Sequence, residues 1–215
     1  MSQPSTRVTR LSELQIASRD ALYELLDATP LATIALVRDD HPVIFPIGFA
    51  RIDDDLVIHG STGSPWLRAV DSGAQVAVSV TMLDGVVVAR SAFESSFRYR
   101  SAALFGSFER VVEDKERCLE ALTESFIPGR VAELRTSTRK ELAATVALRM
   151  PIGDTNWSLK INDGWPEDPP EDIEAGVWGG VVPMSVIYGE PEAAPDCDPA
   201  IAVPQSVRRL ADGSR

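Results

Sequence analysis

The segment HGSTGSPW (59–66) gathers polar groups that could hold an anion. Its hydroxyls come from Ser61, Thr62 and Ser64, and the last of these precedes a proline at which a helix can begin. Unpaired amides and the helix dipole favour a phosphate at such a point. The alternative is a flexible strand-to-helix turn with an ordinary serine cap. No Gly-Lys-Ser/Thr follows, so the segment is not a Walker loop.

Two further segments carry groups that could contact a ligand. In SSFRYRSAALFG (95–106), Arg98 and Arg100 point the same way on a strand, and Arg100 beside Ser101 could bind an anionic or carbonyl group. A solvated charged face is the alternative. In VWGGVVP, Trp178 precedes two glycines, which leaves an indole face open for stacking on a flat ring. Core packing is the commoner use of tryptophan.

The sequence assigns no catalytic residue and no metal site. His59 ends an apolar strand, where a lone histidine is more often packed and hydrogen-bonded than catalytic. There is no GxSxG nucleophile elbow. Cys118 and Cys197 form no CxxC pair, and His41 is the only other imidazole, so the ligands for a structural zinc are lacking. Catalytic residues are therefore left unassigned, and no metal is expected.

Length, composition and charge narrow the class of protein. The 215 residues suit one globular domain, alone or with a tail, with 44% apolar and 25% charged residues. The net charge of −11 argues against general binding to nucleic acid or anionic lipid. No apolar run reaches the roughly 18 residues of a membrane span. The N-terminus lacks the apolar centre of a secretory signal, so we expect a cytoplasmic protein.

Apolar periodicity and turn residues predict the elements that must position these groups. The predicted helices are 12–29, opening with a capping box at Ser12, then 64–73, 113–126, and 138–149, opening with a capping box at Thr138. The predicted strands are 31–38, 43–52, 56–60, 75–82, 86–93 (joined to the previous one by a turn at Asp84-Gly85), 101–112, 156–162 and a pair within 177–189.

This order predicts an α+β fold. Sequential short strands with a few helices on one side imply an antiparallel barrel or a curled sheet. Residues 1–190 would form the domain. Residues 191–215 lose periodicity and gain Pro, Asp and Ala, so we expect a poorly ordered tail there.

Taken together, the segments resemble the FMN-binding split β-barrel family related to pyridoxamine 5′-phosphate oxidase, and most closely its nitroimidazole-resistance branch. They occur in the family's order across about 15–190. The segments that carry the resemblance are HPVIFPIGFARIDDDLVIHGSTGS (41–64), YRSAALFGSFERV (99–111), IPGR (127–130), ELAATVALRMPI (141–152), SLKIN (158–162) and WGGVVP (178–183).

The resemblance implies an antiparallel split β-barrel with peripheral helices, which forms a homodimer with FMN in the groove between subunits. It implies three sets of cofactor contacts, some from the partner subunit. They are Phe45, Pro46 and Ile47 along the isoalloxazine; His59, Ser61, Thr62 and Ser64 along the ribityl phosphate; and Tyr99, Arg100, Ser101 and Trp178 closing the pocket.

One departure from the family pattern follows the loop. Many relatives have an Arg-Lys pair where this chain has Pro65 and Trp66, so Trp66 and Arg68 are the contacts expected here, with Arg68 as the substitute cation. Hydroxyls and amides bind a phosphate more weakly than cations do. FMN could therefore be weakly bound, or a deazaflavin could take the groove. A substrate-phosphate site for pyridoxamine 5′-phosphate oxidase activity is not found.

The expected function is that of a homodimeric FMN-binding oxidoreductase acting on a small organic molecule, in which the flavin supplies the chemistry. A non-catalytic module that stores or senses a flavin or deazaflavin is the alternative. An empty barrel that serves as an interaction scaffold is a third possibility. Arg100 and the 59–66 loop favour the two hypotheses in which a ligand is bound over the empty scaffold. An open flavin face beside Trp178 would favour the oxidoreductase, because a substrate could then reach the flavin.

Overall fold

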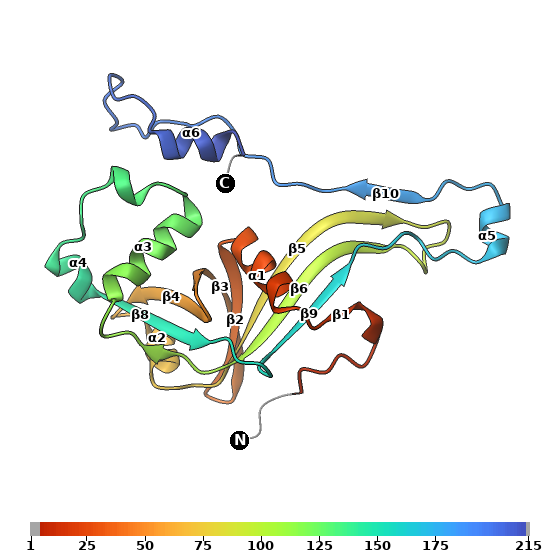
Figure 1. Ribbon diagram of the computed structural model, residues 1–215, viewed down its shortest axis with the longest axis horizontal. Coiled ribbons are helices and arrows are strands. Elements are labelled where there is room, and N and C mark those ends of the chain that lie inside the picture. The colour runs from red at the N-terminus through yellow and green to blue at the C-terminus, as the bar shows by residue number, and fades with distance from the viewer. Residues whose placement is uncertain (1–4, 214–215) are drawn as a thin grey trace.

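A ten-stranded antiparallel sheet organises the chain in the computed structural model, which describes residues 5–213 (Figure 1). Its strand order is β1-β9-β6-β5-β2-β3-β4-β8-β7, and β10 pairs with β5. The strands are β1 (Gln15–Ile16), β2 (Leu31–Arg38), β3 (His41–Ile52), β4 (Asp55–Ser61), β5 (Val76–Val88), β6 (Ser96–Gly106), β7 (Glu109–Arg110), β8 (Thr145–Pro151), β9 (Trp157–Asn162) and β10 (Gly180–Pro183).

Helices lie around this sheet, so the fold is α+β and split-barrel-like, as predicted. They are α1 (Arg19–Ala28), α2 (Pro65–Asp71), α3 (Lys115–Phe126), α4 (Arg139–Ala144), α5 (Pro170–Glu174) and α6 (Gln205–Ala211), with the 3-10 turns η1 (Ser12–Leu14) and η2 (Val131–Glu133). No helix among residues 5–213 is long and apolar enough to cross a membrane.

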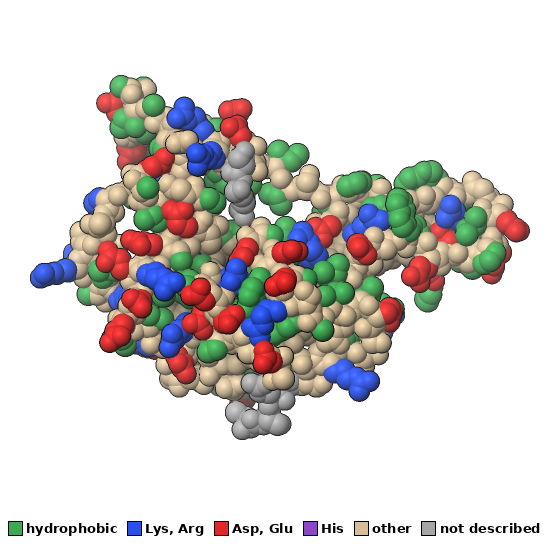
Figure 2. Space-filling model, viewed as in Figure 1, with side chains coloured by type: hydrophobic (Ala, Val, Ile, Leu, Met, Phe, Trp, Pro, Cys, Tyr) green, Lys and Arg blue, Asp and Glu red, His purple; other side chains and the backbone are tan. Residues whose placement is uncertain are grey.

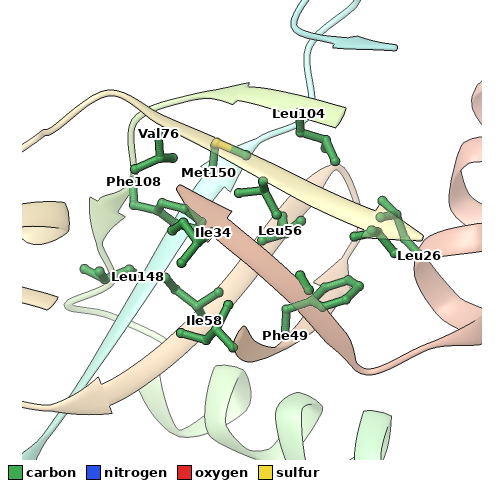
Figure 3. Packing of buried hydrophobic residues seen from close by; sticks show 14 of the residues in the cluster. Leu26, Ile34, Phe49, Leu56, Ile58, Val76, Leu104, Phe108, Leu148 and Met150 are labelled. Carbon is green, nitrogen blue, oxygen red and sulfur yellow. The ribbon is translucent and has the colours of Figure 1, made fainter. Parts of the chain in front are cut away.

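The barrel core forms because alternate residues of each strand point inward. Figure 3 shows Ile34 of β2, Phe49 of β3, and Leu56 and Ile58 of β4 converging on this core. All four side chains are fully buried. The residue between the last two, Val57, points the opposite way, toward a second cluster.

That second cluster lies between the outer face of the sheet and α3. Val57 packs there with Ala147 of β8 and with Cys118 and Leu122 of the helix. The helix predicted over 113–126 is therefore confirmed, with Cys118 and Leu122 on its buried face. Strand β4 is therefore covered by the barrel core on one face and by α3 on the other, so its outward-pointing side chains lie between the sheet and this helix.

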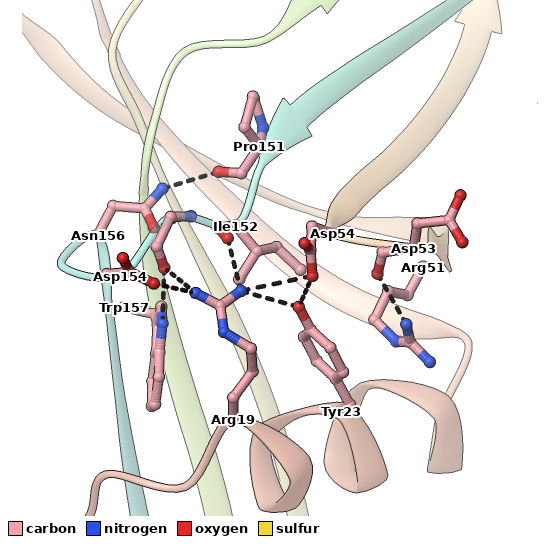
Figure 4. A network of polar contacts seen from close by, with 11 residues as sticks. Arg19, Tyr23, Arg51, Asp53, Asp54, Pro151, Ile152, Asp154, Asn156 and Trp157 are labelled. Atoms are coloured by element: carbon pink, nitrogen blue, oxygen red, sulfur yellow. Dashed lines mark hydrogen bonds and ion pairs between the residues drawn. The ribbon is translucent and has the colours of Figure 1, made fainter.

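Helix α1 is held against two turns of the sheet by a polar network (Figure 4). Arg19 donates to the carbonyl of Ile152 at 2.8 Å and to Asp154 at 2.7 Å. The hydroxyl of Tyr23 donates to Asp54. Because these acceptors belong to two different turns of the sheet, one helix holds both turns together.

A long hairpin of β5 and β6 projects beyond the barrel, and we call its outer part, with β10 and α5, the arm (Figure 1). Strand β10 pairs with the outer end of β5, from Gly180 opposite Val88 to Pro183 opposite Gly85. The predicted turn at Asp84-Gly85 is wrong, because β5 continues through these residues as one strand. The ladder to β6 instead shifts register there, as at a β-bulge.

Two of the predicted helices have different bounds. The helix expected from Ser12 begins only at Arg19, where Ser18 accepts the cap hydrogen bond from the amide of Ala21. The capping box at Thr138 is confirmed, but its helix ends at Ala144. The residues that follow form β8, since they pair with β4 along its whole length.

The C-terminal segments also differ from the predicted pattern. The expected strand pair within 177–189 is the single strand β10, and the strand expected over 101–112 is split between β6 and β7. No helix was expected within 191–215, where α6 spans Gln205–Ala211. Its residue Ser206 is only 3% exposed.

Candidate functional site

The loop between β4 and α2 has the local structure that its sequence predicts. Ser64 is the N-cap residue of α2 and Pro65 its first residue, although the Ser64 side chain makes no cap hydrogen bond. The hydroxyl of Ser61 accepts from the amide of Gly63 at 3.2 Å. The Thr62 amide donates to Ala144 at 3.1 Å. The Ser61 hydroxyl thus closes the turn itself.

A cation does stand beside this loop. Arg68 donates to the Gly63 carbonyl at 3.3 Å, and with Thr62 it lines a hollow of about 330 Å³. Arg110 lines the same hollow, but its guanidinium is paired with Asp71 and lowers the pKa of that carboxyl. Arg68 can therefore supply the charge that the missing Arg-Lys pair would have given.

Aromatic side chains from β3 and α2 meet next to the loop. The ring centroids of Phe45 and Trp66 are 4.4 Å apart, with the planes tilted by 46°. Ile47 lies on the same side of β3 and is buried in the core, whereas Pro46 points outward and is exposed. Phe45, Trp66, Thr62 and Arg68 make up what we call the loop group.

The residues predicted on β6 lie in a different place. Arg100 makes a forked pair with Asp84, at 2.9 Å and 2.7 Å, and these hydrogen bonds raise the pKa of Arg100. The Ser101 hydroxyl bonds with that of Thr81 at 2.8 Å, and Tyr99 stands opposite Asn162 of β9.

Arg100 borders a hollow of about 660 Å³ between the end of α1, the base of the arm and the C-terminal segment. Asp84 also lines this hollow, with Ile187 and Tyr188 from the segment after β10. A charged pair beside apolar side chains is a setting in which a ligand with both polar and flat apolar parts can bind.

Trp178 stands farther out. Its side chain is 65% exposed. Its indole packs against Gly180, with one ring carbon only 2.8 Å from the position that a Cβ on Gly180 would take. Trp178 with Arg100 belongs to the arm group, separate from the loop group. The strand register shows how far apart the two groups are. Phe45 pairs with Ile34, Ile34 with Val78, and Val78 with Leu104. Arg100 therefore lies three strands from Phe45 and four residues further along its strand.

His59 has surroundings of its own. It follows Val57 on the outward face of β4, facing α3, so it points away from the barrel core. It lines a hollow of about 260 Å³ with Leu119, Leu122 and Phe126. Its Nδ1 is buried without a hydrogen-bond partner among residues 5–213, and burial lowers the pKa of its imidazole.

The hollow at His59 could hardly be predicted from the sequence. Its walls are β4 and α3, which are far apart in the chain, and it could be anticipated only by packing the α3 stripe over that strand. Among residues 5–213 no cluster of three or more His, Cys, Asp or Glu side chains could hold a metal ion by itself. The hollow also has polar walls, from Thr123, Ser137, Glu141 and Thr145.

Comparison with known proteins fits this geometry. The sequence profile of pyridoxamine 5′-phosphate oxidase matches residues 18–156. The chain belongs to this family. A search of curated proteins gives no match.

Two solved structures share both the fold and much of the sequence. An FAD and haem binding protein from Mycobacterium smegmatis is 65% identical, with a TM-score of 0.89 over 91% of this chain and 96% of its own. The flavocytochrome Anf3 from Azotobacter vinelandii is 30% identical, with a TM-score of 0.87 over 95% of each chain. A proposed 5-nitroimidazole antibiotic resistance protein from Bacteroides thetaiotaomicron shares the fold at 13% identity and a TM-score of 0.56, over 67% of this chain and 86% of its own.

Within the pyridoxamine 5′-phosphate oxidase family, this chain carries a C-terminal extension to the matched region. The profile ends at residue 156, before β10, Trp178 and α6. The Anf3 alignment covers 95% of the chain, so it takes in most of that extension. Most of the extension is therefore shared with at least one relative rather than peculiar to this protein.

Proposed function

We propose that this protein is a redox protein that binds one flavin and one haem. The observation that carries this proposal is the 65% identity, over 91% of the chain, with a protein known to bind FAD and haem. The name of a second relative, a flavocytochrome, describes the same pair of cofactors. The structure supports it with separate candidate sites, the loop and arm groups and the hollow at His59.

The flavin that we propose is FAD rather than the FMN expected from the sequence. Arg68 is the cation beside the loop. Trp66 of the same helix packs against Phe45, and this pair would offer an aromatic surface to the flavin. Arg100 and the large hollow beside it would hold the rest of the cofactor. A bound flavin would supply hydride or electron transfer, and these side chains would bind and orient it.

We also propose a homodimer, because the loop and arm groups are apart within one chain. Figure 2 shows hydrophobic side chains along the arm. In the segment after β10, Val186 is 76% exposed and Ile187 is 87% exposed. Exposed apolar patches of this kind mark interfaces. In a two-fold dimer the arm of one subunit would cover the loop group of the other and complete the flavin site.

The reaction that we propose is electron transfer between a small organic molecule, the flavin and the haem. No side chain is assigned as an acid or base. A non-catalytic flavin or deazaflavin carrier is the second candidate, favoured by the pairing of the Arg100 guanidinium with Asp84, a contact that suits binding rather than catalysis.

The test is to purify the full chain from cells supplied with a haem precursor and to record its absorbance spectrum. We expect a flavin band and a Soret band, with FAD as the flavin released on denaturation. Release of FMN or a deazaflavin would overturn the choice of FAD, and the absence of both bands after adding FAD and haemin would overturn the proposed function. Loss of the flavin band on adding a reductant, followed by a shift of the Soret band, would distinguish a redox protein from a carrier.

A further inference from the structure

The large hollow beside Arg100 has mainly apolar and sulfur-containing walls. They come from the end of α1, from β5 and from the segment after β10, and include Pro30, Met82, Leu83, Met184, Val186 and Ile187. The volume of about 660 Å³ lies within the range of small-molecule sites, roughly 300–1,000 Å³. Methionine side chains adapt their shape and make favourable contacts with aromatic rings. These walls therefore suit a flat ring system.

The cation in this hollow is already neutralised. Arg100 donates to Asp84 from Nε at 2.9 Å and from Nη2 at 2.7 Å, so the two form a forked ion pair. The pKa of Arg100 is raised, chiefly by hydrogen bonding to Asp84 and further by the charges of Asp84 and Glu24. Asp212 lines the hollow as well. Of the described residues that line it, the charged ones are thus one arginine and two aspartates.

The hollow beside the loop between β4 and α2 has the opposite balance of charge. Arg68, Arg110 and Asp71 line it, and Asp71 is paired with Arg110. Arg68 donates to the Gly63 carbonyl and pairs with no carboxylate among residues 5–213. Like charges that are brought together suppress the binding of a wrong partner. An anionic group is therefore favoured beside Arg68 and disfavoured in the hollow at Arg100.

Arg100 still has hydrogen-bond donors for an uncharged ligand. A guanidinium carries five N–H donors, and Asp84 binds one edge of it. The Nη1 group makes no hydrogen bond among residues 5–213, and the side chain is 31% exposed. Nη1 can therefore donate to a neutral oxygen, such as a carbonyl, on a ligand that brings no charge into the hollow.

We propose that the hollow at Arg100 binds an uncharged, flat organic molecule with a ring carbonyl, and that Asp84 sets this preference by neutralising Arg100. The carbonyl would accept from Nη1, and the ring would lie against Met82 and Met184. This inference rests on the proposed function, since a molecule that exchanges electrons with the flavin must lie beside it. It names the class of that molecule and excludes carboxylates and phosphate esters.

Equilibrium dialysis of the flavin-loaded full chain tests this preference with two ring ligands of one shape. Fluorenone is an uncharged ring ketone, and fluorenone-2-carboxylate adds one negative charge. Wild type should bind fluorenone more tightly by at least about tenfold, which corresponds to about 1.4 kcal/mol. Equal binding of the two ligands, or tighter binding of the carboxylate, would overturn the proposal.

A matched pair of variants assigns the preference to Asp84. Asp84→Asn keeps the size of the side chain but leaves the charge of Arg100 uncompensated, so the preference for fluorenone should be lost or reversed. Asp40→Asn removes the same charge from the exposed turn at the far end of β2, where asparagine tolerates the φ of 60°. It should keep the wild-type ratio of affinities. If Asp84→Asn also keeps that ratio, Asp84 is merely structural and the proposal is overturned.

A second variant covers failure of Asp84→Asn to fold. Asp212 is exposed and follows the last residue of α6, so Asp212→Asn removes one negative charge from the hollow without breaking the pair of Arg100 with Asp84. The preference for fluorenone over its carboxylate should weaken severalfold. Where Asp84→Asn does not fold, an unchanged ratio in Asp212→Asn overturns the proposal.

Flavin content separates this inference from the proposed function. The absence of flavin and haem bands after adding FAD and haemin would overturn the function, whereas selective binding of fluorenone by the same chain would still support the preference of the hollow. A flavin-loaded protein that binds the two ring ligands alike would overturn the class of molecule proposed here while the function stands.

Discussion

Ser206 of α6 and Glu133 of η2 are joined by two hydrogen bonds, although 73 residues separate them. The Ser206 hydroxyl donates to Oε2 of Glu133 at 2.5 Å, and its amide donates to Oε1 at 3.0 Å. Arg130 also pairs with this carboxylate, at 3.0 Å. The C-terminal helix therefore holds in place the turn that follows α3.

This contact should make the C-terminal helix sensitive to acid. The Ser206 hydrogen bonds lower the pKa of Glu133 from 4.5 to about 2. Because the folded pKa is below the unfolded one, the stabilisation is complete above 4.5 and is lost as the pH falls toward 2. The protection of the α6 amides against hydrogen exchange, taken relative to the intrinsic exchange rate at each pH, should decrease over that range.

A matched pair of variants checks that Glu133 is the group responsible. Glu133→Gln should bring the faster α6 exchange to neutral pH, whereas Glu120→Gln on α3 should leave it unchanged. Slow α6 exchange in Glu133→Gln would mean that apolar packing, rather than this carboxylate, holds the helix.

The close approach of Phe126 to Gly48 predicts a second effect. The Cζ of Phe126 lies only 2.5 Å from where a Cβ on Gly48 would be. Gly48→Ala should therefore push the ring aside and destabilise the fold by about 1–3 kcal/mol, the usual cost of overpacking. Urea unfolding measures this change.

Two further variants decide whether the ring is the cause. Gly189→Ala is the control, since nothing lies within 4 Å of a Cβ there. Adding Phe126→Leu to Gly48→Ala should recover part of the lost stability, because the smaller side chain leaves room. A Gly48→Ala protein as stable as Gly189→Ala would contradict the prediction.

Features set by near neighbours in the sequence were predictable. The start of α2 after Ser64 and the capping box at Thr138 depend on side chains within four residues, and both are confirmed. The end of the second helix at Ala144 was not, because β8 is held by pairing with β4, more than 80 residues earlier. Strand β5 runs through Asp84-Gly85 for the same reason, since its neighbours are distant strands.

The candidate site also has parts that depend on near neighbours in the sequence and parts that depend on distant ones. The turn of Ser61 through Ser64 could be read from its composition. That Arg100 pairs with Asp84, and that Phe45 meets Trp66, depends on strand register and on where α2 packs. The surroundings of His59 depend on a helix that begins 56 residues later, so no local pattern could reveal them.

The proposed dimer predicts that one exposed side chain controls assembly. Ile187 is 87% exposed on the segment that lines the large hollow. Ile187→Asp would place a charge in a contact of apolar side chains, and an unpaired buried charge is strongly unfavourable. We expect a dimer for wild type and a monomer for this variant in sedimentation velocity at micromolar concentration.

Val112→Asp is the control for this experiment. Val112 is 81% exposed, but it lies between β7 and α3, away from the arm. This variant should stay dimeric. A monomeric wild type, or a dimer that survives Ile187→Asp, would argue against an interface at this segment.

The loop between β4 and α2 gives the last prediction, on the seat of the flavin phosphate. In the triple variant Ser61→Ala, Thr62→Val, Ser64→Ala, a phosphate would lose hydroxyl donors, each worth roughly 1.5–3 kcal/mol to a charged group. Since about 1.4 kcal/mol is tenfold in affinity, FAD and FMN should bind at least about a hundredfold more weakly. Flavin fluorescence titration measures both.

Riboflavin, which has no phosphate, is the control ligand. The Ser61 hydroxyl also accepts from Gly63, so the triple variant loosens the turn itself, and that loss should weaken all three flavins alike. Only the phosphate contribution should separate FAD and FMN from riboflavin. Equal losses for all three would mean that the hydroxyls merely support the turn, and unchanged binding would put the phosphate beside other residues, with Arg100 the first to test.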